Sequence, residues 1–343
     1  MKVVHLVPAM EQGGVETVVC DLNRVVVGAG WENVVVSRGG RLVATIEADG
    51  GRHVALDLKS KNPLTYFQRA WRLRRLLKAE KPDLVCAHSR VPAWLFVWAN
   101  RTLGLKWITY AHGANSVSRY SEVMTKGDLT VTPSRFLADY LKANYGLAEE
   151  KIRVISPAVD SKRFDPDNLD AAFVAEKRRE WGIEDGDFVT MAVGRISPVK
   201  GYDALIDEFQ ARPVEGRKLV IIGGADRHHL DYERSLKAMA GPHVVFAGQQ
   251  DKIPECLSIA SEVVSANVTK PESFGLSVVE AYAMNKPVRA KRFGGVAEIM
   301  EAVEKVRAHS FREVIIQLYG RARLTKESVA LYTQLVGGSR IGL

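Results

Sequence analysis

The sequence has few cysteines and no long apolar run. Its 343 residues include three cysteines, Cys20, Cys86 and Cys256, which are too scattered for a disulfide framework or a metal site. No run of 18 apolar residues occurs, so the sequence predicts no membrane-spanning helix. The short apolar run after Lys2 leads into glycines without the cleavage pattern of a signal peptide. We therefore expect a cytoplasmic protein.

Two sequence motifs of cofactor and metal binding are absent or weak. Neither half carries Gly-x-Gly-x-x-Gly after its first predicted strand, which disfavours a dinucleotide-dependent dehydrogenase. Asp-x-Asp occurs at residues 165–167 and 185–187 and could bind a diphosphate through a metal. Both copies lie in predicted turns, where Asp, Pro and Gly are common. We expect a site without metal or cofactor.

Strands and helices alternate along the chain, and the alternation starts again at residue 188. The predicted strands lie at residues 3–7, 34–36, 84–87, 107–110, 152–155, 188–193, 219–222, 244–247 and 263–266. This pattern, in a chain long enough for two domains, predicts an α/β protein with two doubly wound Rossmann-like domains. We place the domains at 1–165 and 166–323, followed by a C-terminal helix and tail at 324–343.

The segment Lys270–Glu280 has the strongest chemical pattern. Glu272 and Glu280 flank Phe274-Gly275-Leu276, whose amides are predicted to form an uncapped helix N-terminus after a strand. Such a terminus binds phosphate, whereas carboxylates accept hydrogen bonds from vicinal hydroxyls of a sugar or ribose. The combination predicts a nucleotide-sugar site. The alternative is that Glu272 caps the helix and Glu280 is solvated.

Cationic and glycine-rich loops follow two other predicted strands. Arg195 and Lys200 lie in the loop after residues 188–193 and suit a diphosphate, because they combine a bidentate guanidinium with a point charge. Without a metal, they would stabilise charge on a phosphate leaving group. Gly13 and Gly14 follow the first strand and would let the backbone approach the same phosphates. In doubly wound folds such strand ends face a ligand crevice, here a cleft between the two domains.

Two further strand ends in the first domain carry histidines. His112 follows residues 107–110 and could hydrogen-bond a sugar hydroxyl; a lone histidine is otherwise a packed core residue. His88, Ser89 and Arg90 follow residues 84–87 and could bind an acceptor or have a structural role.

The positive charge is concentrated in the first half. Residues 1–160 carry 22 Lys and Arg against 15 Asp and Glu, whereas residues 161–343 carry 26 against 25. Much of the excess lies in 59–81, where arginines alternate with Phe67, Trp71 and leucines. This segment predicts a basic amphipathic helix, which is either an ordinary surface helix or one that rests on anionic lipid or receives an anionic acceptor. No motif of nucleic-acid recognition accompanies the charge.

In this order and spacing the motifs resemble the family 4 retaining glycosyltransferases of the GT-B fold. The resemblance rests on residues 13–16, 111–113, 154–164, 193–201, 272–280, 287–288 and 294–298. Residues 87–94 and 123–128 resemble bacterial members that build lipopolysaccharide core or related surface glycans.

The resemblance implies two Rossmann-like domains that face each other across a cleft, and a C-terminal segment, 324–343, that packs back on the first domain. It implies transfer with retention from a nucleotide sugar, expected to be UDP-linked, without a metal. Arg195 and Lys200 would hold the diphosphate, Glu272 the sugar hydroxyls and Glu280 the ribose, while His112 would lie beside the reacting sugar. The acceptor would be a lipid-linked or lipopolysaccharide-type glycan at the inner face of the cytoplasmic membrane.

The chain departs from the family pattern in two places. Asn285 stands where family members usually carry glycine, and helical sequence (302–319) follows Gly295 almost directly, without the usual connecting strand and loop. Two alternatives therefore stay open: a nucleotide-sugar epimerase of the same fold, and a non-catalytic sugar-nucleotide-binding subunit.

Overall fold

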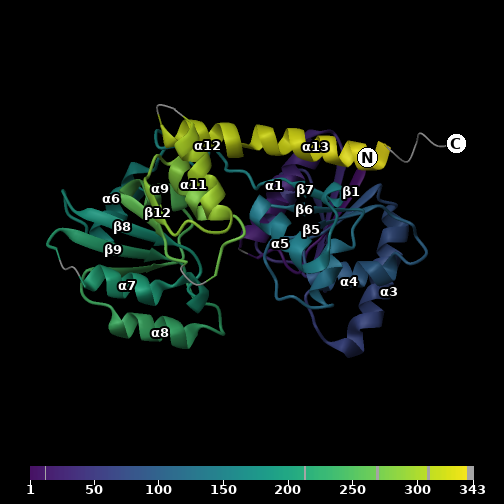
Figure 1. Cartoon of the computed structure of the whole chain (residues 1–343), viewed down its shortest axis with the longest axis horizontal. Helices are drawn as coiled ribbons and strands as arrows, with labels where there is room; N and C mark the ends of the chain where they lie inside the picture. Colours follow the sequence, from purple (N-terminus) through teal and green to yellow (C-terminus); the bar gives the residue numbers. More distant parts are fainter. Residues whose placement is uncertain (12, 212–213, 268–269, 307–309, 338–343) are drawn as a thin grey trace. The chain divides into compact units, whose positions relative to one another are not determined.

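The computed structural model describes residues 1–11, 13–211, 214–267, 270–306 and 310–337. The chain divides into two units, each built on its own parallel sheet (Figure 1). Unit 1 comprises Met1–Ala158 and the segment from Arg321 onward, and unit 2 comprises Val159–Gly320. The predicted pair of doubly wound α/β domains is confirmed, with divisions a few residues before those placed at 165 and 323. The cleft between the domains stays a prediction.

Unit 1 contains a seven-stranded sheet in the order β3-β2-β1-β4-β5-β6-β7. Its strands are β1 (Lys2–Leu6), β2 (Glu32–Ser37), β3 (Arg52–Ala55), β4 (Leu84–Ala87), β5 (Trp107–Tyr110), β6 (Leu129–Thr132) and β7 (Ile152–Val154). Its α-helices are α1 (Gly14–Gly28), α2 (Val43–Ala48), α3 (Tyr66–Glu80), α4 (Arg90–Ala99), α5 (Arg135–Tyr145) and α13 (Arg321–Gly337). Short 3-10 turns η1 (Pro63–Thr65), η2 (Ser121–Thr125) and η3 (Glu149–Lys151) join them.

Unit 2 contains a five-stranded sheet in the order β10-β9-β8-β11-β12. Its strands are β8 (Phe188–Val193), β9 (Arg217–Ile222), β10 (Val244–Gly248), β11 (Glu262–Ser265) and β12 (Val288–Ala290). Its helices are α6 (Ala171–Glu180), η4 (Pro198–Lys200), α7 (Tyr202–Gln210), α8 (Leu230–Met239), α9 (Ile253–Ile259), α10 (Leu276–Ala283), α11 (Gly295–Lys305) and α12 (Phe311–Tyr319).

Each sheet is apolar on both faces because helices cover both. In β1, Val4 and Leu6 pack with residues of α3 and α4, whereas Val3 packs on the opposite face with residues of α1 and α13 (Figure 1). Successive side chains of a strand point to opposite faces. A strand buried on both sides must therefore be apolar throughout, as in the Leu-Val-Cys-Ala of β4. That requirement explains why the apolar runs predicted these strands well.

The prediction of one continuous helix over residues 302–319 is wrong. The structure has α11 ending at Lys305 and α12 beginning at Phe311; residues 307–309 lie outside the described residues. Ser310 starts the second helix, because its side chain accepts a hydrogen bond from the amide of Glu313 at 3.3 Å. A serine in this position satisfies an amide that the first helical turn leaves unpaired.

Asn285 occupies a left-handed backbone conformation after α10. Its φ is +55°, a region that glycine enters freely and that asparagine tolerates better than other residues. Its side-chain oxygen also accepts a hydrogen bond from the amide of Arg312 at 3.0 Å, at the start of α12. The asparagine therefore preserves the backbone path that glycine would allow and adds a contact between two helices.

The two roles of Asn285 can be separated by substitution. Asn285→Ala should lower the free energy of unfolding by about 2 kcal/mol, because alanine is strained in the left-handed region and lacks the acceptor. Asn285→Gly should lower it by about 1 kcal/mol, since only the hydrogen bond is lost. Denaturant unfolding followed by circular dichroism measures both. Equal losses in the two variants would contradict the assigned backbone strain.

Candidate functional site

Two loops meet at the carboxyl edge of the unit 2 sheet. The loop after β8 carries Arg195 and Lys200, and the loop after β11 carries Glu272. The two strands are hydrogen-bonded neighbours with Val263 opposite Met191, so both loops leave the same edge. As a result the ammonium group of Lys200 forms an ion pair with the Glu272 carboxylate, 72 residues along the chain. Both side chains are largely shielded from solvent.

Tyr202 supports this ion pair, and the sequence analysis did not single it out. The Tyr202 ring is buried and its hydroxyl donates to the carbonyl oxygen of Gly194 at 3.1 Å. Burial raises the pKa of this hydroxyl, and the nearby Glu272 carboxylate raises it further. Tyr202 therefore stays protonated and braces the start of the loop that carries Arg195 and Lys200.

Arg195 lies on the open side of the same edge. Its side chain is 71% exposed, and its guanidinium is 4.0 Å from the carboxylate of Asp226 in the loop after β9. The other oxygen of Asp226 contacts His229 Nδ1 at 2.8 Å. Hydrogen bonding to the His228 amide, reinforced by His229 and Arg195, lowers the pKa of Asp226. An exposed arginine beside one acid can turn toward an incoming anion.

The N-terminus of α10 is open in the way the sequence predicts. Gly275 precedes the helix with φ +111°, and no side chain caps it. Only glycine fits, because a Cβ atom there would lie 2.8 Å from Val296. The amide of Gly295 donates to the carbonyl of Glu272 at 2.8 Å, which holds the loop in front of the helix. The buried Phe274 ring anchors the same loop.

The remaining unit 2 predictions fall into two groups. Leu276 and Glu280 lie four residues apart in α10, and positions with this spacing share one face of a helix. The Asp-x-Asp residues have structural partners instead: Asp165 pairs with Arg312 at 3.3 Å, and Asp187 accepts the amide of Glu184 at 2.9 Å. Within the described residues, no group of three His, Cys, Asp or Glu side chains could hold a metal.

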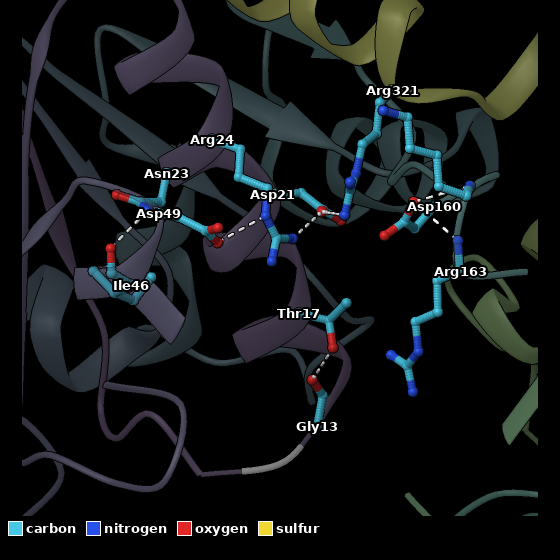
Figure 2. Close-up of polar contacts among 11 residues, drawn as sticks. Gly13, Thr17, Asp21, Asn23, Arg24, Ile46, Asp49, Asp160, Arg163 and Arg321 are labelled. Carbon is cyan, nitrogen blue, oxygen red and sulfur yellow. Dashed lines mark hydrogen bonds and ion pairs between the residues drawn. The ribbon is translucent and has the colours of Figure 1, made fainter. Parts of the chain in front are cut away.

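In unit 1, Gly13 and Gly14 begin helix α1 after β1. Gly13 is the N-cap residue, and its carbonyl accepts both the amide and the hydroxyl of Thr17, each at 3.0 Å (Figure 2). A Cβ atom on Gly14 would meet nothing within 4 Å. The space beside Gly14 is thus open, as expected for a backbone that a ligand can approach closely.

Three histidines form a hydrogen-bonded chain at the carboxyl edge of the unit 1 sheet. His5 Nδ1 lies 2.9 Å from His88 Nε2, and His88 Nδ1 lies 3.0 Å from His112 Nε2. The His88 ring stacks on Tyr110 with ring centroids 4.7 Å apart. His112 thus lies where the sequence predicted, at the end of β5, but it is held by two other histidines. His5 was not predicted as part of a site.

The hydrogen bonds among the three histidines change the interpretation of His88. The residue is 3% exposed and both its ring nitrogens are engaged inside unit 1, so it belongs to the histidine chain and offers no free nitrogen to an acceptor. Ser89 is the N-cap residue of α4. The Arg90 guanidinium donates to Ser121 at 3.0 Å and lies over the Tyr120 ring. Of the three predicted acceptor-binding residues, Ser89 and Arg90 keep partly exposed side chains.

Burial keeps all three rings neutral. Loss of solvation lowers the pKa of His5 to about 3 and that of His112 to about 4. It also lowers the pKa of His88 well below the usual range, and the two neighbouring histidines add to this effect. Near neutral pH each ring therefore has one N–H donor and one bare acceptor nitrogen.

Comparison with known proteins agrees with this arrangement. The model of Glycosyltransferase Family 4 matches residues 12–163, and that of Glycosyl transferases group 1 matches residues 173–314. Both halves of the chain are thus matched, and the two matches meet near the division between the units. The chain belongs to the family 4-type glycosyltransferases of the GT-B fold.

Curated relatives share part of the sequence. The D-inositol 3-phosphate glycosyltransferase of Rhodococcus opacus (strain B4) is 29% identical over 192 residues, which are 53% of this chain and 42% of the relative. The protein of the same name from Jonesia denitrificans is 28% identical over 338 residues, covering 83% of this chain and 76% of the relative. The chain thus spans less than half the length of the first of these relatives.

Solved structures share the fold over the whole chain. A glycosyltransferase from Rickettsia africae ESF-5 matches with a TM-score of 0.82 and 21% identity, covering 98% of both chains. Anabaena Alr3699/HepE, solved in complex with UDP-glucose, matches with 0.81 and 18%, covering 97% of this chain and 100% of its own. WaaG, a glycosyltransferase involved in lipopolysaccharide biosynthesis, matches with 0.67 and 14%, covering 99% and 95%.

The depressed histidine pKa values predict a loss of stability in mild acid. Below about pH 6.5 the histidines of the unfolded chain bind protons, whereas the buried histidines of the folded chain stay neutral. Their contribution to the free energy of unfolding is therefore fully present above about pH 6.5 and decreases as the pH drops. Each buried histidine should contribute about 1.4 kcal/mol per pH unit between roughly pH 6 and 4. His5→Asn should reduce the slope of the free energy of unfolding against pH by the contribution of one histidine. The neighbouring Tyr110, Tyr332 and Cys86 have raised pKa values and do not titrate there.

Tryptophan fluorescence in denaturant can measure this slope, because five of the six tryptophans lie in unit 1. Comparison of slopes, rather than of absolute stabilities, removes the effect of the substitution itself. Identical slopes in the two proteins would show that His5 titrates normally in the folded state.

Proposed function

We propose that the protein is a retaining, metal-independent glycosyltransferase that moves a sugar from a UDP-linked donor to a lipid-linked or lipopolysaccharide-type glycan. The observation that carries the proposal is the meeting of Lys200, Glu272 and the open N-terminus of α10 at one sheet edge. A cation, a carboxylate and unpaired amides together suit a ligand that has both phosphates and hydroxyls. UDP-glucose in the HepE structure supports this donor class.

In this proposal unit 2 binds the donor. Arg195 turns from Asp226 to the diphosphate, and the amides at the start of α10 bind the same anion. Glu272 accepts hydrogen bonds from sugar hydroxyls while its ion pair with Lys200 fixes its direction. Lys200 retains further N–H donors for the phosphate beside the sugar. Glu280, one turn into α10, binds the ribose hydroxyls.

The proposed chemistry needs no protein nucleophile and no metal. The bond between the sugar C1 and the phosphate oxygen breaks while the acceptor oxygen bonds to C1 on the same face, so configuration is retained. The acceptor's hydroxyl proton passes to the departing phosphate oxygen. Arg195, Lys200 and the α10 amides stabilise the negative charge that develops on that phosphate. In unit 1, Gly13 and Gly14 approach the phosphates and His112 lies beside the sugar.

A surface on α3 supports an acceptor at the cytoplasmic face of a membrane. Leu64, Phe67 and Trp71 are 90%, 63% and 49% exposed; with the exposed Arg75 and Lys78 they form a stripe, the α3 patch, at three- and four-residue spacing. The Arg75 guanidinium lies 4.8 Å from the centre of the Trp71 ring. Exposed aromatic and basic side chains together favour an anionic lipid surface. No helix in the described part of the chain is long and apolar enough to span the bilayer.

Two arginines of the predicted basic helix do not belong to this patch. Arg69 is buried and donates to Thr65, Asn62 and Asp57. Arg74 donates to the Ala99 carbonyl at the end of α4 at 3.0 Å. Both stabilise the fold of unit 1, and the opposite face of α3 buries Leu73 and Leu77. The buried face is that of an ordinary surface helix, and the proposed membrane contact concerns the exposed face alone.

Arg195→Ala tests the donor site. The substitution should lower turnover with UDP-glucose by roughly two to three orders of magnitude, the effect of losing one group that stabilises transition-state charge. Transfer is measured as UDP release, with and without a lipid-linked glycan, in excess chelator so that metal dependence is tested at once.

The control is Arg179→Ala, which removes an exposed arginine of α6 in the same unit. It should leave turnover unchanged, and both variants should melt near the wild-type temperature. Normal transfer by Arg195→Ala would remove Arg195 from the site. Abolition of wild-type transfer by chelator, with rescue by Mg²⁺ or Mn²⁺, would contradict metal independence. Interconversion of donor sugars without transfer would indicate an epimerase.

Removing the charge of the α3 patch tests the membrane surface. The test variant combines Arg75→Gln and Lys78→Gln of the patch with Arg72→Gln, which removes an exposed arginine next to Trp71 on the same helix. Each basic residue near an anionic surface contributes about 1 kcal/mol, so the three changes together should weaken binding to phosphatidylglycerol vesicles by about 100-fold. Donor affinity should not change, because these residues are in unit 1. Vesicle sedimentation at low and physiological salt measures the effect, which should shrink as salt screens the charges.

The matched control removes three exposed basic side chains of unit 2, with Arg179→Gln, Arg227→Gln and Lys305→Gln. It has the same net charge as the test variant and should bind vesicles like the wild type. Equal weakening in both triple variants would mean that net charge, not the α3 patch, directs binding. Salt-insensitive vesicle binding would contradict an electrostatic contact.

A further inference from the structure

The histidine chain of unit 1 has a feature beyond the role proposed for His112. His5, on β1, is fully buried. Its ring is hydrogen-bonded to that of His88, which in turn is hydrogen-bonded to that of His112. A histidine interrupts the apolar sequence of β1 at a position that ordinary core packing would fill with an apolar residue. Burying such a polar ring is unfavourable unless its hydrogen bonds are satisfied.

The two hydrogen bonds must run in the same direction. Each links Nδ1 of one ring to Nε2 of the next, and a neutral ring carries its proton on only one nitrogen. If His5 Nδ1 donates to His88 Nε2, then His88 carries its proton on Nδ1 and donates to His112 Nε2. In the opposite direction His112 Nε2 donates to His88, and His88 Nε2 donates to His5. The proton of one ring therefore determines the tautomer of all three.

The surroundings of His5, at the inner end of the histidine chain, favour one of these two directions. His5 Nε2 is buried and has no hydrogen-bond partner among the described residues. In the opposite direction this nitrogen would carry a buried, unpaired N–H, which native structures rarely contain. In the first direction it is a bare acceptor, and unsatisfied acceptors are less unusual than unsatisfied donors. The direction from His5 outward is favoured.

With this direction, His112 at the outer end of the histidine chain keeps one N–H donor. His112 Nε2 accepts from His88, and in the residues that the structure describes His112 Nδ1 has no partner. The Nδ1–H group is therefore available to an acceptor atom of a ligand.

We infer that His5 and His88 are positioning residues that fix His112 as its Nδ1–H tautomer, so that it donates a hydrogen bond to a hydroxyl oxygen of the bound sugar. The ligand role of His112 rests on the proposed function, whereas the tautomer does not. His5 acts at a distance, through His88, and does not touch substrate.

The tautomers can be measured without any assay of activity. In protein labelled with ¹⁵N-histidine, long-range proton–nitrogen correlation at pH 7.5 should show Nδ1–H rings for His5, His88 and His112. In His5→Met the thioether sulfur can only accept a hydrogen bond, so His88 should donate from Nε2 and His112 should become partly or wholly Nε2–H. In His5→Asn the amide nitrogen replaces Nδ1 as donor, so His112 should keep its wild-type tautomer. An Nε2–H ring for His112 in the wild type would overturn the inference, even if His5→Met does not fold.

Kinetics supply the second readout. His5→Met should lower kcat about tenfold, the effect of misdirecting one hydrogen bond, with a donor KM within twofold of wild type. His5→Asn should restore kcat to within twofold. Equal loss in both variants, or unchanged kcat in His5→Met, would overturn the positioning role. If the wild type transfers no sugar but shows the expected tautomers, the proposed function fails while the tautomer assignment stands.

Discussion

The parallel pairing of β8 with β11 is the constraint on which the donor site depends. With Val263 opposite Met191, the loops that follow the two strands must leave the sheet side by side. The ion pair between Lys200 and Glu272 is a consequence of this register. A slip of one residue would turn the side chains of either strand to the opposite face. The Gly295 amide and the Gly275 backbone then fix the loop between Glu272 and α10.

The two units present different electrostatic environments at their strand ends. In unit 2 the groups are charged: Lys200 and Glu272 form a largely shielded ion pair, whereas Arg195 is mostly exposed and pairs only loosely with Asp226. In unit 1 the groups are buried and neutral, because burial lowers the pKa of each histidine. An exposed cation suits an anion that must bind and leave. Neutral rings in a fixed direction suit a hydroxyl group that must be oriented.

The sequence predicted most central strands but missed β6; of the four edge strands it predicted β7 and β10 and missed β3 and β12. Central strands such as β8 are apolar runs because both faces are covered. Edge strands β3 and β12 are short and contain Arg52, His53 and Arg289, so their periodicity resembles that of a loop. Local motifs likewise placed Arg195, Lys200, Glu272 and Gly275 in loops that follow strands, where the structure has them.

The histidine chain could not be predicted, because it depends on the register between strands. Cys86 of β4 pairs with His5 of β1 and with Ile108 of β5, and this register brings His88 between His5 and His112. The one signal in the sequence was a histidine within an otherwise apolar strand. Tyr202 and Asp226 were missed for the same reason, since their roles come from neighbours in the folded chain.

The C-terminal helix completes the surroundings of the histidines. Arg321, at the start of α13, pairs with the buried Asp21 of α1 at 3.2 Å, and Arg24 contacts both Asp21 and Asp49 (Figure 2). Burial raises the pKa of Asp21 despite both arginines, so these ion pairs specify position more than they stabilise the fold.

Further along α13, the Tyr332 hydroxyl meets that of Tyr110 at 2.5 Å, and Tyr110 stacks on His88. A helix more than 200 residues distant in sequence thereby closes the apolar wall that keeps the histidines neutral. Because the three rings are neutral, one proton determines the direction of both hydrogen bonds in the histidine chain. The tautomer of His112 therefore depends on the packing of α13 within unit 1.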